Sequence, residues 1–156
     1  MGSAWSRHRS TGKVDSFPNT QPQTISLTMY TFELSLQYRK AVRERDLDAV
    51  LALFSPDALI ETPLKGRCDA RSYHEWLFAT VKKSTVKVIN AFQALNSEIC
   101  IAVLADYEWL MNDGKVVNFS GMSVFDFTAD KRKIKKMSTF YDTSMVRPQI
   151  TTLSNS

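Results

Sequence analysis

The chain is poor in the residues from which several common kinds of site are built. Its 156 residues include two cysteines, Cys68 and Cys100, and two histidines, which argues against a Cys/His zinc site and against a disulfide scaffold. Such sparing use of thiols is typical of a reducing compartment, and we expect a cytoplasmic location. No run of about 18 apolar residues is present, so the sequence predicts no membrane-spanning helix and no membrane partner.

Motifs that mark a bound cofactor are also missing. The sequence has no glycine-rich phosphate loop, no HExxH and no GxSxG, which are the patterns that hold phosphates, zinc or a nucleophilic serine. We therefore expect neither a cofactor nor a metal ion. Five glycines and five prolines also exclude a collagen-like or low-complexity chain.

Positive charge is in slight excess, and half of that excess lies at the start of the chain. The net charge is +4, of which residues 1–28 contribute +2. The remainder is nearly balanced, which gives no basis for a nucleic-acid partner. A basic run at residues 131–136 is typical of a solvated hairpin end, and a patch for an acidic partner is the alternative.

Residues 1–28 differ in composition from the rest of the chain. They are rich in Ser and Thr and lack any helical or strand period, so we predict a flexible N-terminal extension, native or added ahead of a start at Met29. A faint likeness to a transit peptide, from two arginines and several serines, is the alternative. We expect residues 29–148 to form one domain and residues 149–156 a polar tail.

The spacing of apolar residues changes along the domain. A helical period up to Ser84 predicts three helices, from Tyr30 to Arg45, from Leu47 to about Ser55 with Asp46 as N-cap, and from Asp69 to Val81, with a short strand at 58–63. A period of two then predicts four strands joined by tight turns, at 85–95, 98–111, 115–128 and 132–142. Helices followed by an antiparallel meander indicate an α+β domain, and Gly121 marks a bend that curls the sheet.

The strand at 98–111 has two unlike faces. One is wholly apolar or aromatic, and the other carries Asp106 and Glu108, whose Cβ atoms should lie about 7 Å apart. Two carboxylates on so apolar a strand either reach solvent or line a cavity. We expect them to project into a hollow beneath the helices. The apolar face, from Ile99 to Trp109, then needs a cover, and we infer a homodimer through this outer sheet face.

Several segments resemble a known family. Residues 46–54 and 57–63, then 125–127, Ile134 and 140–143 are similar to the SnoaL-like polyketide cyclase group of the nuclear-transport-factor-2-like superfamily. The resemblance covers roughly residues 30–148. It implies a cystatin-type α+β roll, in which a curved antiparallel sheet and N-terminal helices form a cone, and relatives often dimerise. The fold hosts many unrelated activities.

Ketosteroid isomerases of this superfamily provide one comparison of residues. Tyr38 corresponds to their oxyanion-hole tyrosine. Their catalytic aspartate falls at Thr62 and their second oxyanion donor near Ser123. Two of the three roles are therefore absent, which disfavours steroid isomerisation by that route.

Limonene-epoxide hydrolases provide a second comparison of residues. Glu108 corresponds to one acid of their Asp-Arg-Asp set, whereas Asp106 stands at their arginine and Thr139 at their second aspartate. That set is not intact either. The resemblance thus implies positions that face a pocket rather than one particular reaction.

The candidate site combines these positions. We expect Glu108 and Asp106 to act as an acid/base pair. Two carboxylates repel each other in a cavity from which water is excluded, so the pKa of one of them rises. Tyr38 would donate a hydrogen bond to a substrate carbonyl, or simply fill the core. His74 is interpreted as a helix-side histidine without a catalytic role. The residues expected to contact substrate are Glu61, Thr62, Trp76, Phe119, Ser123, Thr139 and Tyr141.

Two functions remain open. The first is a cofactor-independent enzyme, an isomerase, cyclase, dehydratase or epoxide hydrolase, acting on a small hydrophobic molecule of polyketide or terpenoid type. The second is a non-catalytic ligand-binding or dimerising module. The second predicts a cavity filled by side chains such as Trp76, Phe119 and Phe125, and carboxylates that point into bulk water.

Overall fold

Residues with a helical period form helices packed on one side of a sheet. The computed structural model describes residues 22–97 and 99–151, and its first three helices are α1 (Pro22–Glu44), α2 (Leu47–Ala52) and α3 (Ala70–Thr80). Helix α1 begins at Pro22 rather than near Tyr30, so residues 22–28 of the predicted extension are helical. Proline suits a first helical turn, where its fixed φ and missing N–H cost nothing. The rest of that predicted extension, residues 1–21, lies outside the described residues.

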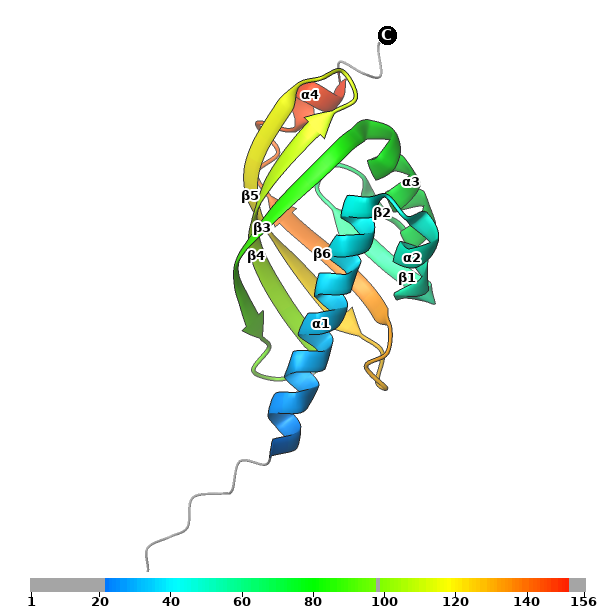
Figure 1. The fold of residues 1–156 in the computed structure, drawn as a ribbon, viewed down its shortest axis with the longest axis vertical. Helices are drawn as coiled ribbons and strands as arrows, with labels where there is room; N and C mark the ends of the chain where they lie inside the picture. Colours follow the sequence, from blue (N-terminus) through cyan, green and yellow to red (C-terminus); the bar gives the residue numbers. More distant parts are fainter. Residues whose placement is uncertain (1–21, 98, 152–156) are drawn as a thin grey trace, which may run out of the picture.

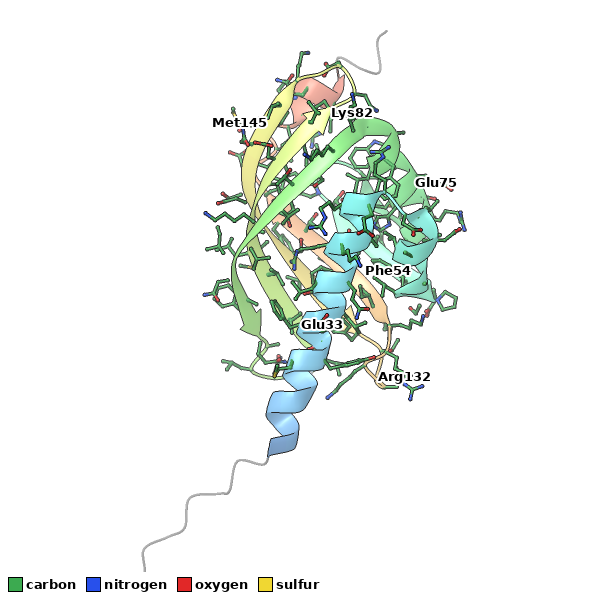
Figure 2. All side chains as sticks on the ribbon, viewed as in Figure 1. Glu33, Phe54, Glu75, Lys82, Arg132 and Met145 are labelled. Carbon is green, nitrogen blue, oxygen red and sulfur yellow. The ribbon has the colours of Figure 1, made fainter. Side chains whose placement is uncertain are left out.

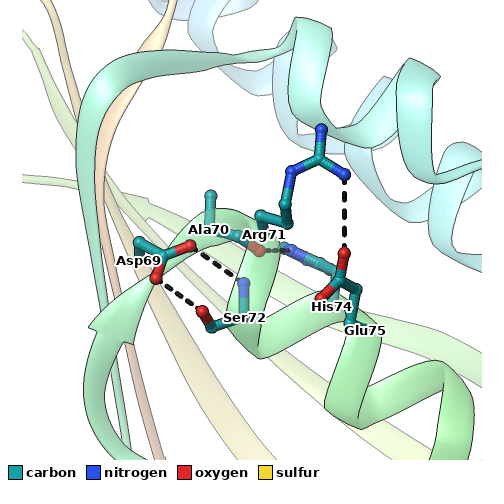
Figure 3. Close-up of polar contacts among 6 residues, drawn as sticks. All are labelled: Asp69, Ala70, Arg71, Ser72, His74 and Glu75. Carbon is teal, nitrogen blue, oxygen red and sulfur yellow. Dashed lines mark hydrogen bonds and ion pairs between the residues drawn. The ribbon is translucent and has the colours of Figure 1, made fainter.

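Aspartates cap two of these helices, as predicted. Asp46 accepts a hydrogen bond from the N–H of Ala49 at 2.9 Å, and Asp69 accepts one from the N–H of Ser72 at 2.9 Å (Figure 3). Helix α2 ends earlier than predicted, before Phe54, because that residue already pairs with Ile134 in the sheet. Each cap satisfies an N–H that the first helical turn leaves without a partner.

Six strands form one sheet in the order β2-β1-β6-β5-β4-β3. They are β1 (Phe54–Thr62), β2 (Gly66–Asp69), β3 (Val81–Gln93), β4 (Cys100–Met111), β5 (Val116–Phe127) and β6 (Ile134–Tyr141). The four-stranded antiparallel meander β3 to β6 confirms the prediction. The short strand β2 was not predicted, and β1 pairs with β6 in parallel, which makes the sheet mixed.

The sheet is strongly curved and does not close, and α1 crosses one of its faces (Figure 1). Helices α2 and α3 lie beside α1, and the short α4 (Arg147–Thr151) follows the last strand. The predicted fold, an α+β cone, is confirmed. Side chains occupy the space between α1 and the sheet, whereas Glu33, Glu75 and Arg132 lie at the surface (Figure 2).

Strand β4 shows which face of the sheet α1 covers. Ile101, Val103, Ala105 and Trp109 are at most 5 % exposed, and we call the face that carries them the concave face. The opposite one is the convex face. The apolar face of β4 is therefore covered within the same chain, so the expectation that it packs on a second copy is wrong. Among the described residues, no helix is both long and apolar enough to cross a membrane.

Candidate functional site

A cavity of about 90 Å³ lies between α1, α3 and the concave face. Helix α1 contributes Tyr38, Arg39 and Val42, and α3 contributes Tyr73 and Leu77. The sheet supplies most of the remaining wall, including Ser84, Tyr107, Trp109, Phe119, Ser123, Phe125, Met137, Thr139 and Tyr141. The described residues that line the cavity include no aspartate or glutamate.

Aromatic rings form much of the wall. Tyr107 and Phe119 stack with their ring centroids 5.0 Å apart, and Trp109 and Tyr141 each pack on Phe119 at 4.9 Å. Phe119 and Phe125 both belong to this wall. A wall of this kind suits a flat, apolar ligand.

Gly121 permits this packing. A Cβ at this position would lie 3.1 Å from the carbonyl oxygen of Phe140, 3.1 Å from Cβ of Tyr141 and 3.6 Å from the ring of Tyr107. The space that a side chain would need is thus already filled by strand β6 and the cavity-lining ring of Tyr107. Glycine keeps the wall close without a clash.

Behind the cavity wall, Tyr38 meets His74. Both side chains are buried, and the hydroxyl of Tyr38 lies 3.1 Å from Nε2 of His74. The other ring nitrogen, Nδ1, lies 2.7 Å from the carbonyl oxygen of Ala70 (Figure 3). A carbonyl oxygen can only accept, so Nδ1 carries the hydrogen of the neutral ring.

These contacts fix the direction of the Tyr38 hydrogen bond. Burial lowers the pKa of His74 to about 4 against the opposing effect of the Ala70 carbonyl, so the ring is neutral near pH 7 and Nε2 accepts. Burial also raises the pKa of Tyr38, so its hydroxyl keeps its hydrogen and donates it to His74. Tyr38 can therefore accept a hydrogen bond from a ligand, whereas the sequence had suggested a donor.

Arg39 is the most unusual polar group in the wall. Its Nη2 atom is buried and has no hydrogen-bond partner in the described part of the protein, and its Nη1 reaches Ser35 Oγ only at 3.5 Å. Burial lowers the pKa of Arg39, although the guanidinium stays protonated at neutral pH. Thr139 Oγ1 is likewise buried without a partner among the described residues.

Three hydroxyl groups from three strands complete the polar part of the wall. The hydroxyl of Tyr107 lies 3.1 Å from Ser123 Oγ, and Ser123 is the register partner of Thr139. All three residues line the cavity together with Arg39. We call Arg39, Tyr107, Ser123 and Thr139 the polar strip.

The two predicted catalytic carboxylates lie elsewhere. Asp106 and Glu108 are exposed on the convex face, where Asp106 accepts a hydrogen bond from Ser120 Oγ at 2.7 Å. The expectation that they project into the hollow is wrong. Side chains alternate along a strand, and α1 covers the face richest in apolar groups, so both acids must point to solvent.

The other predicted positions divide into two groups. Tyr38, Phe119, Ser123, Thr139 and Tyr141 all line the cavity. The structure places the remaining three outside it, namely Glu61, Thr62 and Trp76.

Each of those three has a local partner that explains its position. Glu61 pairs with Lys136 at 2.8 Å, and this hydrogen bond lowers the pKa of its carboxyl. Thr62 Oγ1 accepts from the N–H of Lys65 at 3.1 Å. Trp76 lies 6.0 Å from the ammonium of Lys65. All three therefore stabilise the turn and strand around β1 and β2.

Sequence reasoning did not place His74 in the core beside Tyr38, although a signal was present. The buried residues of α3 are Ala70, Tyr73, His74, Leu77 and Thr80, which is the i, i+3, i+4, i+7 spacing of one helix face. Trp76, which we expected to contact substrate, lies off this face and is only partly buried. A histidine on the inner face of a helix needs a polar partner, and Tyr38 provides it.

Comparisons with known proteins agree with this architecture. A family model described as SnoaL-like domain matches residues 36–137. A comparison with curated protein sequences finds no match. Among solved structures, PrhC from Penicillium brasilianum is similar with a TM-score of 0.68 and 17 % identity, over 83 % of this chain and 91 % of that one.

Two bacterial structures are similar to a comparable degree. A putative SnoaL-like polyketide cyclase from Shewanella denitrificans has a TM-score of 0.62 and 12 % identity, covering 78 % of this chain and 97 % of that one. A putative aromatic ring hydroxylase from Novosphingobium aromaticivorans has a TM-score of 0.63 and 20 % identity, covering 75 % of this chain and 90 % of that one. Identities this low show a shared fold and no more.

Proposed function

We propose, since this chain belongs to the SnoaL-like domain family, that it is a cofactor-independent enzyme that moves a proton on a small, largely apolar molecule. The reaction class we propose is isomerisation or ring closure. The observation that carries this proposal is the Tyr38–His74 pair, in which Tyr38, a residue of the cavity wall, already donates its hydroxyl hydrogen to a neutral, buried imidazole.

This pair can accept and return a proton. An acidic hydrogen of the substrate would bond to the oxygen of Tyr38. As that proton moves to the Tyr38 oxygen, the phenolic hydrogen moves to Nε2 of His74, which leaves a substrate anion beside an imidazolium. Because burial disfavours the imidazolium, the proton returns by the same path to a different substrate atom. No other reactant is consumed, which suits a rearrangement.

A second candidate function has its own support. Asp106 and Glu108 lie in solvent, so the carboxylate acid/base chemistry first expected for this chain loses its basis. A non-catalytic protein that holds a ligand in the same cavity would need only the aromatic wall and the polar strip. The two candidates differ in whether the bound ligand exchanges protons with the protein.

Deuterium exchange separates them. Native mass spectrometry of protein purified from its source would first identify a bound ligand. That ligand, or 2-tetralone as a general probe with acidic hydrogens, would then be incubated with the protein in heavy water. We expect the protein to accelerate deuterium uptake and Tyr38→Phe to lose about 100-fold or more of this acceleration.

Glu108→Gln is the matched control, because this carboxylate is exposed on the convex face. We expect this variant to accelerate deuterium uptake by the ligand as much as the unchanged protein does. A ligand that binds without accelerated exchange would favour the non-catalytic function. An unchanged rate in Tyr38→Phe would instead show that another group accepts the proton.

A further inference from the structure

Arg39 is a cation without a counter-ion in the described part of the protein. It lines the cavity next to Tyr38, and no ion pair to a described aspartate or glutamate involves it. One of its terminal nitrogens is buried without a partner. The rest of this half-buried side chain has one long hydrogen bond, from Nη1 to Ser35 Oγ, so the guanidinium keeps a donor available for an anionic ligand.

Two of the described arginines outside the cavity form ion pairs. Arg71 meets Glu75 at 3.4 Å and Arg67 meets Glu61 at 3.8 Å. In the cavity, the other charged lining residue is Arg43, which is also a cation. The wall is therefore positive and has no described carboxylate to neutralise it.

The polar strip adds three hydroxyl groups to the positively charged part of the wall. Thr139 Oγ1 has no partner among the described residues, and the Tyr107–Ser123 pair adjoins it. A hydroxyl can donate to an oxyanion, as a guanidinium does. The rest of the wall is aromatic, so the cavity combines a flat apolar part with one polar, cationic part.

We infer that the ligand of this cavity is an aromatic molecule with one acidic group, a carboxylate or phenolate, that is already an anion when it binds and that pairs with Arg39. Thr139 supplies a second donor to the same group. This inference rests on the proposed function only in that both place a small molecule in this cavity. It adds the charge and the ring character of that molecule.

Matched probes test the inference directly. Calorimetry would compare 2-naphthoate with 2-naphthamide, which has nearly the same shape but no charge. At pH 8 it would compare 4-nitrophenolate with 4-nitroanisole, to separate a carboxylate from a phenolate. We expect at least one anion to bind ten-fold or more tighter than its neutral counterpart, because a guanidinium pairs with both oxyanions.

Arg39→Met should abolish that preference while it leaves binding of the neutral probes unchanged. Arg132→Met is the control, because Arg132 is exposed on the turn before β6 and should keep the full preference. We also expect Arg39→Met to melt at the same or a higher temperature, since it removes a half-buried charge that has no counter-ion among the described residues. If Arg39→Met does not fold, the ratio of anionic to neutral probe affinity in the unchanged protein still tests whether the cavity prefers an anion.

The outcomes separate this inference from the proposed function. Equal binding of both members of each pair would overturn the anionic ligand and leave the cavity as a small-molecule site. A preference that persists in Arg39→Met would overturn the role of Arg39. Failure of all four probes to bind would count against the small-molecule cavity, and so against the proposed function and this inference together.

Discussion

Tyr38 donates its phenolic hydrogen to Nε2 of His74, and the carbonyl of Ala70 holds the proton on the opposite ring nitrogen. Two groups, one from each of two helices, thus set the tautomer of one imidazole. The arrangement works only while the ring is neutral, because a protonated Nε2 would itself be a donor facing the Tyr38 hydroxyl. The stability of the site therefore depends on pH.

The first prediction concerns that dependence. The pKa of His74 is about 4 in the folded protein and 6.5 ordinarily, so the unfolded chain binds more protons between these values. Stability is complete above about pH 6.5 and falls as the pH drops toward 4, by about 3 kcal/mol. Urea unfolding of the unchanged protein and of His74→Gln, repeated between about pH 4 and pH 6.5, measures this change in the free energy of unfolding. A difference between the two that does not change with pH would contradict the buried, neutral ring.

The second prediction concerns the exposed carboxylates. Asp106→Asn and Glu108→Gln should leave ligand binding unchanged and shift the free energy of unfolding by no more than about 0.5 kcal/mol, because both side chains meet solvent on the convex face. Calorimetry and chemical denaturation test this. Loss of binding in either variant would show that the sheet presents its other face to the ligand.

The third prediction concerns Gly121. In Gly121→Ala the new methyl group meets the carbonyl of Phe140 and Cβ of Tyr141 at 3.1 Å, so two strands must move apart. We expect a loss of about 1–3 kcal/mol in unfolding free energy and weaker ligand binding, because Tyr107 is displaced as well. The exposed Asn118→Ala, on the same strand, should change stability by less than about 0.5 kcal/mol. Equal losses of stability in Gly121→Ala and Asn118→Ala would contradict the close approach of Gly121 to β6.

The fourth prediction concerns oligomeric state. On the convex face, Leu104, Met122 and Phe140 are register partners across three strands, and Phe140 is 59 % exposed. We propose a homodimer through this face, because a second copy would cover the apolar row. Light scattering after size exclusion should give a dimer, and Phe140→Lys a monomer. Met145→Lys, an equally exposed position outside the sheet, should stay dimeric. A monomeric unchanged protein would refute this interface.

Local patterns predicted the elements well and their partners poorly. The caps Asp46 and Asp69 and the four strands of the meander follow from short-range spacing, which is a property of neighbouring residues. Strand β2 has four residues without alternation and so left no signal. The parallel pairing of β1 with β6 joins segments far apart in the chain, and no short-range pattern encodes it.

The site was harder to predict than the fold for a different reason. The alternation in β4 identified two faces, but the two carboxylates were taken to mark the inner one. Burial follows apolar area instead, and Val103 and Ala105 on the other face are fully buried. Tyr38 was found through the family resemblance. His74 and Arg39 required the packed structure, because their importance comes from which partners they have and lack.

The parallel pairing of β1 with β6 also has a consequence for synthesis of the chain. Glu61 and Ser138 are register partners although 77 positions separate them. While the ribosome is still making the meander, β1 and β2 can form only a two-stranded ribbon, which is marginal in water. Strand β1 therefore gains its second neighbour in the sheet only after β6 has been made, and a chain that ends before residue 134 would leave this edge of β1 unpaired and open to proteolysis.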